Sequence, residues 1–441
     1  MGKSAADMKH RVDAAALSGR WTICSMLFVA TTINYVDRQV LSILKPVLAG
    51  NVLHLQPLLP GWPTVEASIN LTDVQYGNIL AAFQVAYALG VVFAGRLVDR
   101  LGCRKGYPIV TGLWSLAAMG HALVNSVTGF AVARFLLGLG ESGNFPAAVK
   151  ATAEWFPPKE RALATGVFNS GASVGAILAP LAVPWVALHF GWRASFLITG
   201  LFSAIWIVWW SIRYRTPQGN AATTVAAKTP EIRVKTVAWW ELLRYRQAWG
   251  FMLGKFLTDP VWWFFLFWLP QYFNSRFKLD LSHLGLPLVV VYVCSTVGSV
   301  FGGWLPRGFT HLGMALKTAR LTAMLTCACL VVPIAVAGGL HSVWLAVGLL
   351  SLAAAAHQGW SANIFTTASD MFPARFVGTV VSFGQVAGAL GGAIFQPVCG
   401  HIVQLTHSFV PLFIYSGSAY LVALLLLRAL APGLKEALPG D

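Results

Sequence analysis

The chain has 441 residues, of which 56% are hydrophobic and only 11% are charged, and its mean hydropathy is +0.66. Soluble globular proteins carry about 25% charged residues, so this composition excludes a water-soluble fold and predicts a protein embedded in a lipid bilayer. The net charge of +15 leaves nucleic acid open as a partner until the positions of the cations are examined.

Apolar stretches of about 20 residues, the length that crosses a bilayer as a helix, follow one another along the chain. We place twelve of them, at residues 21–41, 74–97, 106–126, 129–149, 162–188, 194–212, 249–273, 284–305, 318–337, 343–364, 377–403 and 409–427. The first follows a polar, basic segment and is longer than the core of a signal peptide, so we interpret it as a retained helix. The sequence therefore predicts an all-α membrane protein with twelve transmembrane helices in two pseudo-symmetric six-helix bundles.

Lysine and arginine gather in alternate connections between these stretches and near both ends of the chain. Because cytoplasmic loops carry the excess of cations, we expect both termini to be cytoplasmic. This placement explains the basic excess, so no nucleic acid partner is expected. The predicted divisions are a tail at 1–20, a bundle at 21–212, a linker at 213–247, a second bundle at 248–428 and a tail at 429–441.

The two halves contain related segments. The segment "ESGNFPAAVKATAEWFP" that starts at Glu141 aligns with "HQGWSANIFTTASDMFP" that starts at His357. Further along, a second match places glycines opposite glycines: Gly171 and Gly175 opposite Gly388 and Gly392. Such a repeat is typical of transporters that bind their substrate at the interface of the two repeats, near the middle of the membrane.

The segment "GRLVDRLGCRK", at residues 95–105, joins the second and third stretches. It matches, at every fixed position, the loop signature G-x-L-x-D-R-x-G-x-R-K of the major facilitator superfamily, which it therefore resembles. The resemblance implies that an Asp99-centred charge network latches the two halves together in the outward-facing state, and we expect the glycines to allow close helix approach. The residues of this predicted gating motif are Gly95, Asp99, Arg100, Gly102 and Arg104.

Ionisable residues inside apolar stretches are costly and are therefore functional candidates. The first stretch contains Asp37 and Arg38, the fourth contains Arg134 and Glu141 two turns apart, and the seventh contains Lys255 and Asp259 at i and i+4. A symporter for an organic acid needs an arginine for the carboxylate and a carboxyl group that can exchange a proton. The alternative, that these are ion pairs which only hold helices together, stays open for Lys255 and Asp259.

Three segments resemble the anion:cation symporter family, and most of all its bacterial hexuronate and sugar-acid transporters: "NYVDR", "RFLLGLGESGNFPAAVKATAEWFPPKERALATGVFN" and "DPVWWFFLFWLPQYF". The resemblance implies alternating access and proton-coupled uptake of a sugar acid across a bacterial inner membrane. It implies that Arg38 holds the substrate carboxylate, that Asp37 and Glu141 are the protonatable pair, and that Arg134 tunes or neutralises them. Hydroxyl and amide contacts are expected from Tyr35, Tyr87 and Asn169.

The second half offers further candidates. His357 lies at the repeat-related position of Glu141, where an imidazole is either a hydrogen-bonded packing residue or a polar wall of the cavity. Trp360 is expected to give a sugar acid a stacking face, and Asn363 and Gln385 are expected to offer amide donors to its hydroxyls. The two neighbouring tryptophans at 262 and 263 fit the commoner role of packing or interfacial aromatics.

Two other functions compete with sugar-acid symport. The first is a carrier for an uncharged sugar or drug, in which the intramembrane charges only balance each other. The second is a membrane sensor or enzyme, but the stretches contain no spacing typical of a metal or nucleophile site. We therefore expect no enzymatic activity, no metal and no cofactor apart from protons as the coupling ion, and a small organic anion as the substrate of a functional monomer. Hexuronates, aldonates and aldarates remain alternatives.

Overall fold

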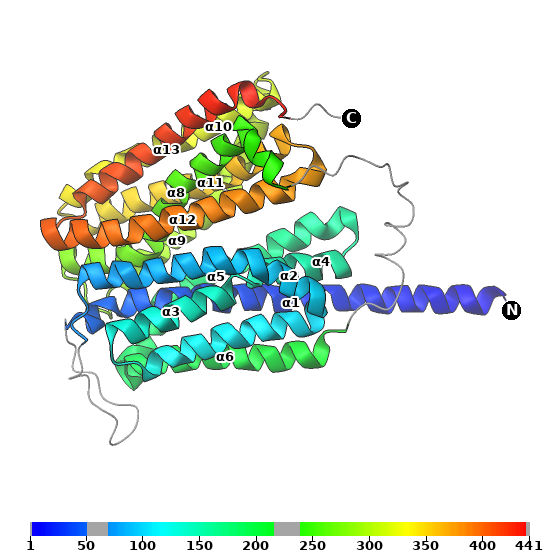
Figure 1. The fold of residues 1–441 in the computed structure, drawn as a ribbon, viewed down its shortest axis with the longest axis horizontal. Helices are drawn as coiled ribbons and strands as arrows, with labels where there is room; N and C mark the ends of the chain where they lie inside the picture. Colours follow the sequence, from blue (N-terminus) through cyan, green and yellow to red (C-terminus); the bar gives the residue numbers. More distant parts are fainter. Residues whose placement is uncertain (1, 51–68, 216–238, 438–441) are drawn as a thin grey trace.

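The computed structural model describes residues 2–50, 69–215 and 239–437, and these are almost entirely helical. Most of the predicted linker and the last residues of the C-terminal tail lie outside the described residues. The helices form two bundles that lie side by side, one coloured blue to green and the other green to red in Figure 1. The N-terminal half contains α1 (Gly2–Leu48), α2 (Asp73–Gly120), η1 (His121–Leu123), α3 (Val127–Glu141), α4 (Asn144–Trp155), α5 (Pro158–Phe190) and α6 (Trp192–Arg213). The C-terminal half contains η2 (Trp239–Arg244), α8 (Arg246–Phe277), α9 (Gly285–His311), α10 (Leu316–Val331), η3 (Val332–Gly339), α11 (Val343–Met371), α12 (Ala374–Thr406), α13 (Val410–Leu430) and η4 (Pro432–Leu434).

Each predicted stretch falls on helix, with α2 containing two of them and α3 with α4 sharing one. Eight of the described helices are long and apolar enough to cross a membrane. Neither α1 nor α8 is among them, and these two helices carry Asp37, Arg38, Lys255 and Asp259. Helices α3 and α4, at 15 and 12 residues, are each too short because the helix is interrupted after Glu141. The helical fold is thus as predicted, whereas the count of twelve crossings stays a prediction.

The second and third predicted helices join at Gly102, whose φ of 70° and ψ of 163° interrupt the helical geometry of α2. Only glycine adopts such a positive φ without strain, so the gating motif needs a glycine there for the backbone turn. The expected close helix approach is wrong for Gly95 and Gly102, because a Cβ at either position would have no described neighbour within 4 Å.

Glycines at repeat-related positions allow equivalent helices of the two halves to pack closely on their neighbours. A Cβ at Gly171 or Gly175 of α5 would overlap with carbonyl oxygens of α1, and a Cβ at Gly388 of α12 would overlap with the side chain of Asp259 on α8. Small residues allow helices to approach closely inside a membrane. The two halves therefore use the same packing device to position α1 and α8, the helices that carry most of the intramembrane charges.

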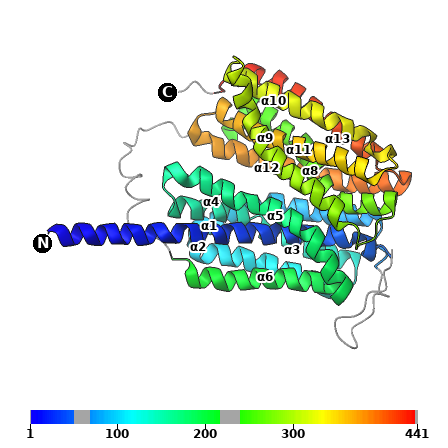
Figure 2. The same cartoon turned by 180° about the vertical axis from the view of Figure 1, so that it is seen from behind.

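The two halves contact each other through polar groups near the first residues of α2. The Tyr76 hydroxyl donates to the Phe267 carbonyl oxygen at 2.8 Å, and the Ser42 hydroxyl donates to that of Leu266 at 3.2 Å. The Asp73 carboxylate accepts from Lys45 of its own half and from Gln271 of the other half. These contacts lie at the end of the molecule away from the two termini, which are at the same end in Figures 1 and 2.

Candidate functional site

A cavity of about 370 Å³ lies between the two halves, and helices of both halves line it. Its size suits a small polar ligand. Sequence reasoning identified seven of the lining residues as candidates for substrate or proton binding: Tyr35, Arg38, Tyr87, Glu141, Asn169, His357 and Gln385.

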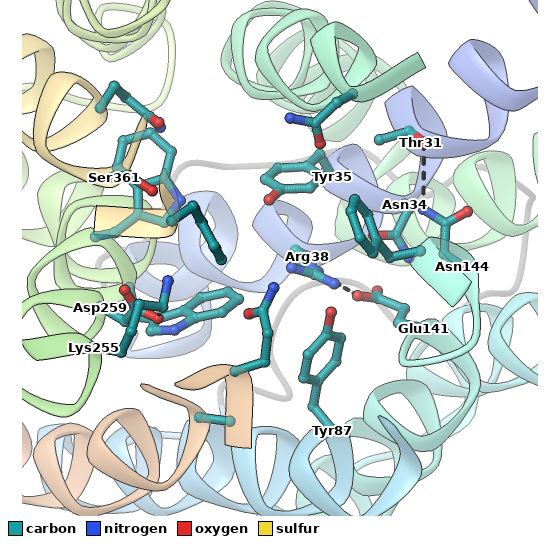
Figure 3. A pocket seen from close by; sticks show the side chains of 18 of the residues that line it. Thr31, Asn34, Tyr35, Arg38, Tyr87, Glu141, Asn144, Lys255, Asp259 and Ser361 are labelled. Carbon is teal, nitrogen blue, oxygen red and sulfur yellow. Dashed lines mark hydrogen bonds and ion pairs between the residues drawn. The ribbon is translucent and has the colours of Figure 1, made fainter. Parts of the chain in front are cut away.

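The wall on the N-terminal half is built around Arg38 and Glu141. Arg38 Nε donates to Glu141 Oε2 at 2.5 Å, and the two side chains are 4% and 0% exposed. Among the described residues, no group accepts a hydrogen bond from the two terminal nitrogens of Arg38. Figure 3 shows the Arg38 guanidinium near the centre of the cavity. Because guanidinium binds carboxylates through paired donors, this cation is placed to bind an acidic ligand while its Nε is held by Glu141.

Aromatic rings from both halves surround the same guanidinium. The Cζ atom of Arg38 lies 4.9 Å from the ring centroid of Tyr35, 5.0 Å from Tyr87, 5.3 Å from Trp263 and 5.6 Å from Phe83. Cation–π contacts of this length stabilise a desolvated cation. Trp263 belongs to α8, so the charge of Arg38 is bound by both halves in this conformation.

The position of Glu141 follows from the packing of α3 on α2. A Cβ at Gly140 would lie 2.6 Å from the Trp114 backbone nitrogen, and one at Gly138 would overlap with the Phe83 carbonyl oxygen. Glycine at both positions therefore lets α3 pack directly on α2. Helix α3 then ends at Glu141, where the next side chain, Ser142, donates to the Leu139 carbonyl oxygen at 2.7 Å. The interruption leaves Glu141 at a helix end that faces α1.

Two other predicted residues lie behind this wall and do not line the cavity. Arg134 donates from one terminal nitrogen to the backbone carbonyl of Arg38 at 3.1 Å. Its Nε and its other terminal nitrogen are buried without a hydrogen-bond partner in the described part of the chain, and so are both carboxyl oxygens of Asp37. Arg134 thus contacts the backbone of Arg38. The Asp37 carboxyl group is buried beside the hydroxyls of Thr199 and Ser203, but no described group is in hydrogen-bonding geometry with it.

The wall on the C-terminal half carries a second ion pair. Lys255 Nζ lies 2.8 Å from Asp259 Oδ2, and it also lies 4.2 Å from the ring centroid of Phe365. Both members of the pair line the cavity. The sequence left open whether this pair only holds helices together, and its place in the wall shows that it can also contact a ligand.

His357 has both of the roles that the sequence left as alternatives. Its Nδ1 lies 2.5 Å from the Tyr420 hydroxyl oxygen, and its ring stacks on Trp262 with a centroid distance of 5.2 Å and an interplanar angle of 2°. It also lines the cavity, as Glu141 does at the repeat-related position. The imidazole is thus a packed and hydrogen-bonded part of the polar wall.

Trp360 and Asn363 do not line the cavity, contrary to the expectation that they contact the substrate. Trp360 is 1% exposed and packs edge-on against Tyr420, with 5.5 Å between ring centroids. The Asn363 amide donates to the backbone carbonyls of Gly302 at 2.7 Å and Gly359 at 2.8 Å. In this conformation both side chains are used for packing within the C-terminal half.

Sequence reasoning missed several residues of the cavity or gave them a packing role. On α1, Thr31, Asn34 and Arg38 follow one another at spacings of three and four residues, which places them on the same face of the helix. This spacing is a sequence signal for Thr31 and Asn34. The two tryptophans expected to be packing or interfacial aromatics, Trp262 and Trp263, both line the cavity. Apart from Lys255 and Asp259, whose role the sequence left open, the lining residues not identified as binding candidates are Thr31, Asn34, Asn144, Phe145, Trp262, Trp263, Gln358, Ser361, Phe365, Val381 and Ala389.

The gating motif forms its ion pair inside the N-terminal half. Lys150 of α4, which the sequence did not single out, has its Nζ 2.9 Å from Asp99 Oδ1 and also donates to the Val98 carbonyl oxygen at 3.1 Å. The side chains of Arg100 and Arg104 are exposed. The motif therefore ties α4 to the turn in α2 in this conformation.

Comparisons with known proteins agree with this architecture. A family model described as the Major Facilitator Superfamily matches residues 27–396. The hexuronate transporter of Escherichia coli strain K12 is 30% identical over 89% of this chain and 90% of its own length. The galacturonate transporter of Dickeya chrysanthemi is 31% identical over 66% of this chain and 82% of its own length. The crystal structure of a D-xylose–proton symporter superposes with a TM-score of 0.72 at 16% identity, over 94% of this chain and 98% of that one, which shows a shared fold.

Proposed function

Because the chain belongs to the Major Facilitator Superfamily, we propose that it is a secondary active transporter that carries a sugar acid together with protons by alternating access. The protein is a transporter and not an enzyme. The relatives that carry hexuronate and galacturonate support a sugar acid as the substrate. We assign the protein to the bacterial inner membrane as a functional monomer that uses protons and no cofactor.

The observation that carries this proposal is the Arg38–Glu141 ion pair in the wall of the cavity. The substrate carboxylate binds the terminal nitrogens of Arg38, because these are the donors that Glu141 leaves free. With Glu141 ionised, the Arg38–Glu141 pair is neutral, and a bound carboxylate would give the pair and the ligand together a single net negative charge. A proton on Glu141 removes that excess charge. Substrate and proton therefore favour each other's binding, which is the coupling that symport requires.

We assign Asp37 as a second residue that binds a proton. Both of its carboxyl oxygens are buried without a partner in the described residues, and an unpaired carboxylate is expensive to bury. We therefore assign a proton to Asp37 in this conformation. Arg134, which donates a hydrogen bond to the backbone carbonyl of Arg38, is the cation that stabilises the Asp37 carboxylate after the proton has left.

We infer that this conformation is the inward-facing state. The contacts of Tyr76, Asp73 and Ser42 close the molecule at the end away from the termini. The distribution of cations along the sequence assigns the termini to the cytoplasm, so this closed end is the external one. In the outward-facing state the gating motif, including Gly95, Asp99, Arg100, Gly102 and Arg104, stabilises closure of the cytoplasmic end.

Uptake by the purified protein in liposomes tests the proposal. With an inwardly directed proton gradient, we expect accumulation of labelled galacturonate or gluconate, and no accumulation when the gradient is abolished with a protonophore. Neutral galactose is the matched control, since it shares the hydroxyls and lacks the carboxylate. Accumulation of galactose that sugar acids fail to inhibit would support the uncharged-sugar carrier and overturn the proposal.

A further inference from the structure

Two ion pairs from opposite halves line the same cavity. Arg38 and Glu141 belong to the N-terminal half, and Lys255 and Asp259 belong to α8 of the C-terminal half. Figure 3 shows the second pair across the cavity from Glu141, with the Arg38 guanidinium between them. Binding of one carboxylate and one proton uses only the first pair, so the second pair has no assigned role.

The second pair is positioned by two other helices. The Phe365 ring of α11 lies 4.2 Å from Lys255 Nζ, and Gly388 of α12 lies so close to the Asp259 carboxylate that a Cβ would overlap with it. The Lys255 side chain is 4% exposed and that of Asp259 is 17% exposed. Replacing a buried ion pair by apolar residues is often neutral or stabilising. Stability alone is therefore a weak reason for charges at this place in the wall.

We propose that Lys255 is a second anion-binding position, which Asp259 occupies until it takes up a proton, so that the cavity accepts a sugar acid with a carboxylate at each end. This rests on the proposed function, because Arg38 must hold the first carboxylate. With one carboxylate bound and Glu141 protonated, the four side chains and the ligand sum to zero charge. A second carboxylate adds one negative charge. A proton on Asp259 restores neutrality and releases the Lys255 ammonium.

Other titratable groups face the pair from three helices. His357 of α11 interacts electrostatically with Lys255, while Tyr420 of α13 and Tyr35 of α1 interact electrostatically with Asp259. His357 is already hydrogen-bonded to Tyr420 and stacked on an aromatic ring. Of the groups that face Lys255, the Asp259 carboxylate is the one in an ion pair with it. Asp259 is therefore the group whose protonation opens the site.

Binding of galactarate and galacturonate to the purified full chain, measured by calorimetry over a range of pH, tests this inference. Galactarate has two carboxylates and galacturonate has one. We expect the wild type to bind both, with galactarate taking up about one more proton than galacturonate. Lys255→Met should weaken the binding of galactarate roughly 10- to 100-fold more than the binding of galacturonate, as loss of a charge-assisted hydrogen bond implies. Lys255→Arg should restore most of the difference.

Asp259→Asn provides a second readout that does not depend on Lys255→Met being folded. In this variant the extra proton taken up with galactarate should disappear, so that both ligands show the same pH dependence. The inference is overturned if the wild type binds galacturonate but not galactarate, if Lys255→Met weakens both ligands equally, or if Asp259→Asn keeps the extra proton. If neither acid binds the wild type, the proposed function fails together with this inference.

Discussion

Arg38 of α1 and Glu141 of α3 are joined by an ion pair of 2.5 Å although they lie 103 positions apart in the chain. The pair connects the cation proposed to bind the substrate directly to the acid proposed to bind the proton. Any change in the charge of one residue must therefore alter the free energy of the charged form of the other. This is the smallest unit in which substrate and proton binding can be coupled.

Replacing Arg38 should abolish high-affinity binding. Arg38→Ala removes the paired donors and leaves Glu141 buried without its counter-charge, and truncating one partner of a buried charge pair costs about 2–5 kcal/mol. Arg38→Lys keeps the charge but loses the planar fork, so it should bind weakly. Calorimetry with galacturonate measures both. The control is Arg428→Ala, at an exposed position near the end of α13, which should bind like the wild type. If Arg38→Ala binds galacturonate with the affinity of the wild type, Arg38 does not bind the substrate carboxylate.

The charged part of the site could be predicted from sequence, because an ionised side chain in an apolar stretch is rare enough to stand out. Arg38, Glu141 and Tyr87 were found in this way or through the family motifs, and all three line the cavity. Thr31 was missed although its helical spacing from Arg38 is a signal, whereas Ser361 could not be found, because small polar residues are also common in helix packing inside membranes.

The sequence alone did not predict which face of α11 points into the cavity. His357, Gln358 and Ser361 line the cavity, whereas Asn363 bonds to backbone carbonyls of α9 and of its own helix. A polar residue in this helix was equally compatible with either face. The conformational state was also unpredictable, because it depends on contacts such as that of Tyr76 with α8, between segments far apart in sequence.

Packing of α1 on α5 should be sensitive to a single methyl group. Gly171→Ala places a Cβ in overlap with the Phe28 backbone carbonyl, which cannot move without shifting α1, and overpacking of this kind costs about 1–3 kcal/mol. We expect a lower Tm in thermal unfolding. Gly166→Ala is the matched control on the same helix, since a Cβ there meets nothing within 4 Å in the described residues and alanine favours helix. Equal Tm values for the two variants would contradict the packing described for α5.

Closure of the end that we assign to the outside should depend on Asp73. Asp73→Asn replaces the carboxylate that accepts from Gln271 of the other half, and a hydrogen bond to a charged group contributes about 1.5–3 kcal/mol. The change also leaves the buried Lys45 ammonium of the same half without its counter-charge, and opening of that end would expose this ammonium to water. The population should therefore shift toward conformations open at that end. Spin labels can be attached to cysteines introduced at the exposed positions Leu123 and Leu405, one in each half. Double electron–electron resonance should then report longer distances between the two labels in Asp73→Asn than in the protein without this substitution.

Asp280→Asn is the control for this shift, because Asp280 at the same end pairs with His283 three residues further along the same segment and not with the other half. Its distance distribution should match that of the unsubstituted protein. If Asp73→Asn gives the same distribution as Asp280→Asn, the Lys45–Asp73–Gln271 contacts do not hold this end closed.

Glu141→Gln tests the coupling of proton and sugar acid most directly. Glutamine has the shape of protonated glutamate and cannot release a proton, so the variant should mimic the substrate-binding form permanently. In liposomes, we expect it to exchange labelled for unlabelled galacturonate across the membrane but not to accumulate galacturonate when a proton gradient is applied. Arg38→Ala should fail in both assays. Accumulation by Glu141→Gln at the wild-type level would contradict the account, because protons would then be coupled to transport without Glu141.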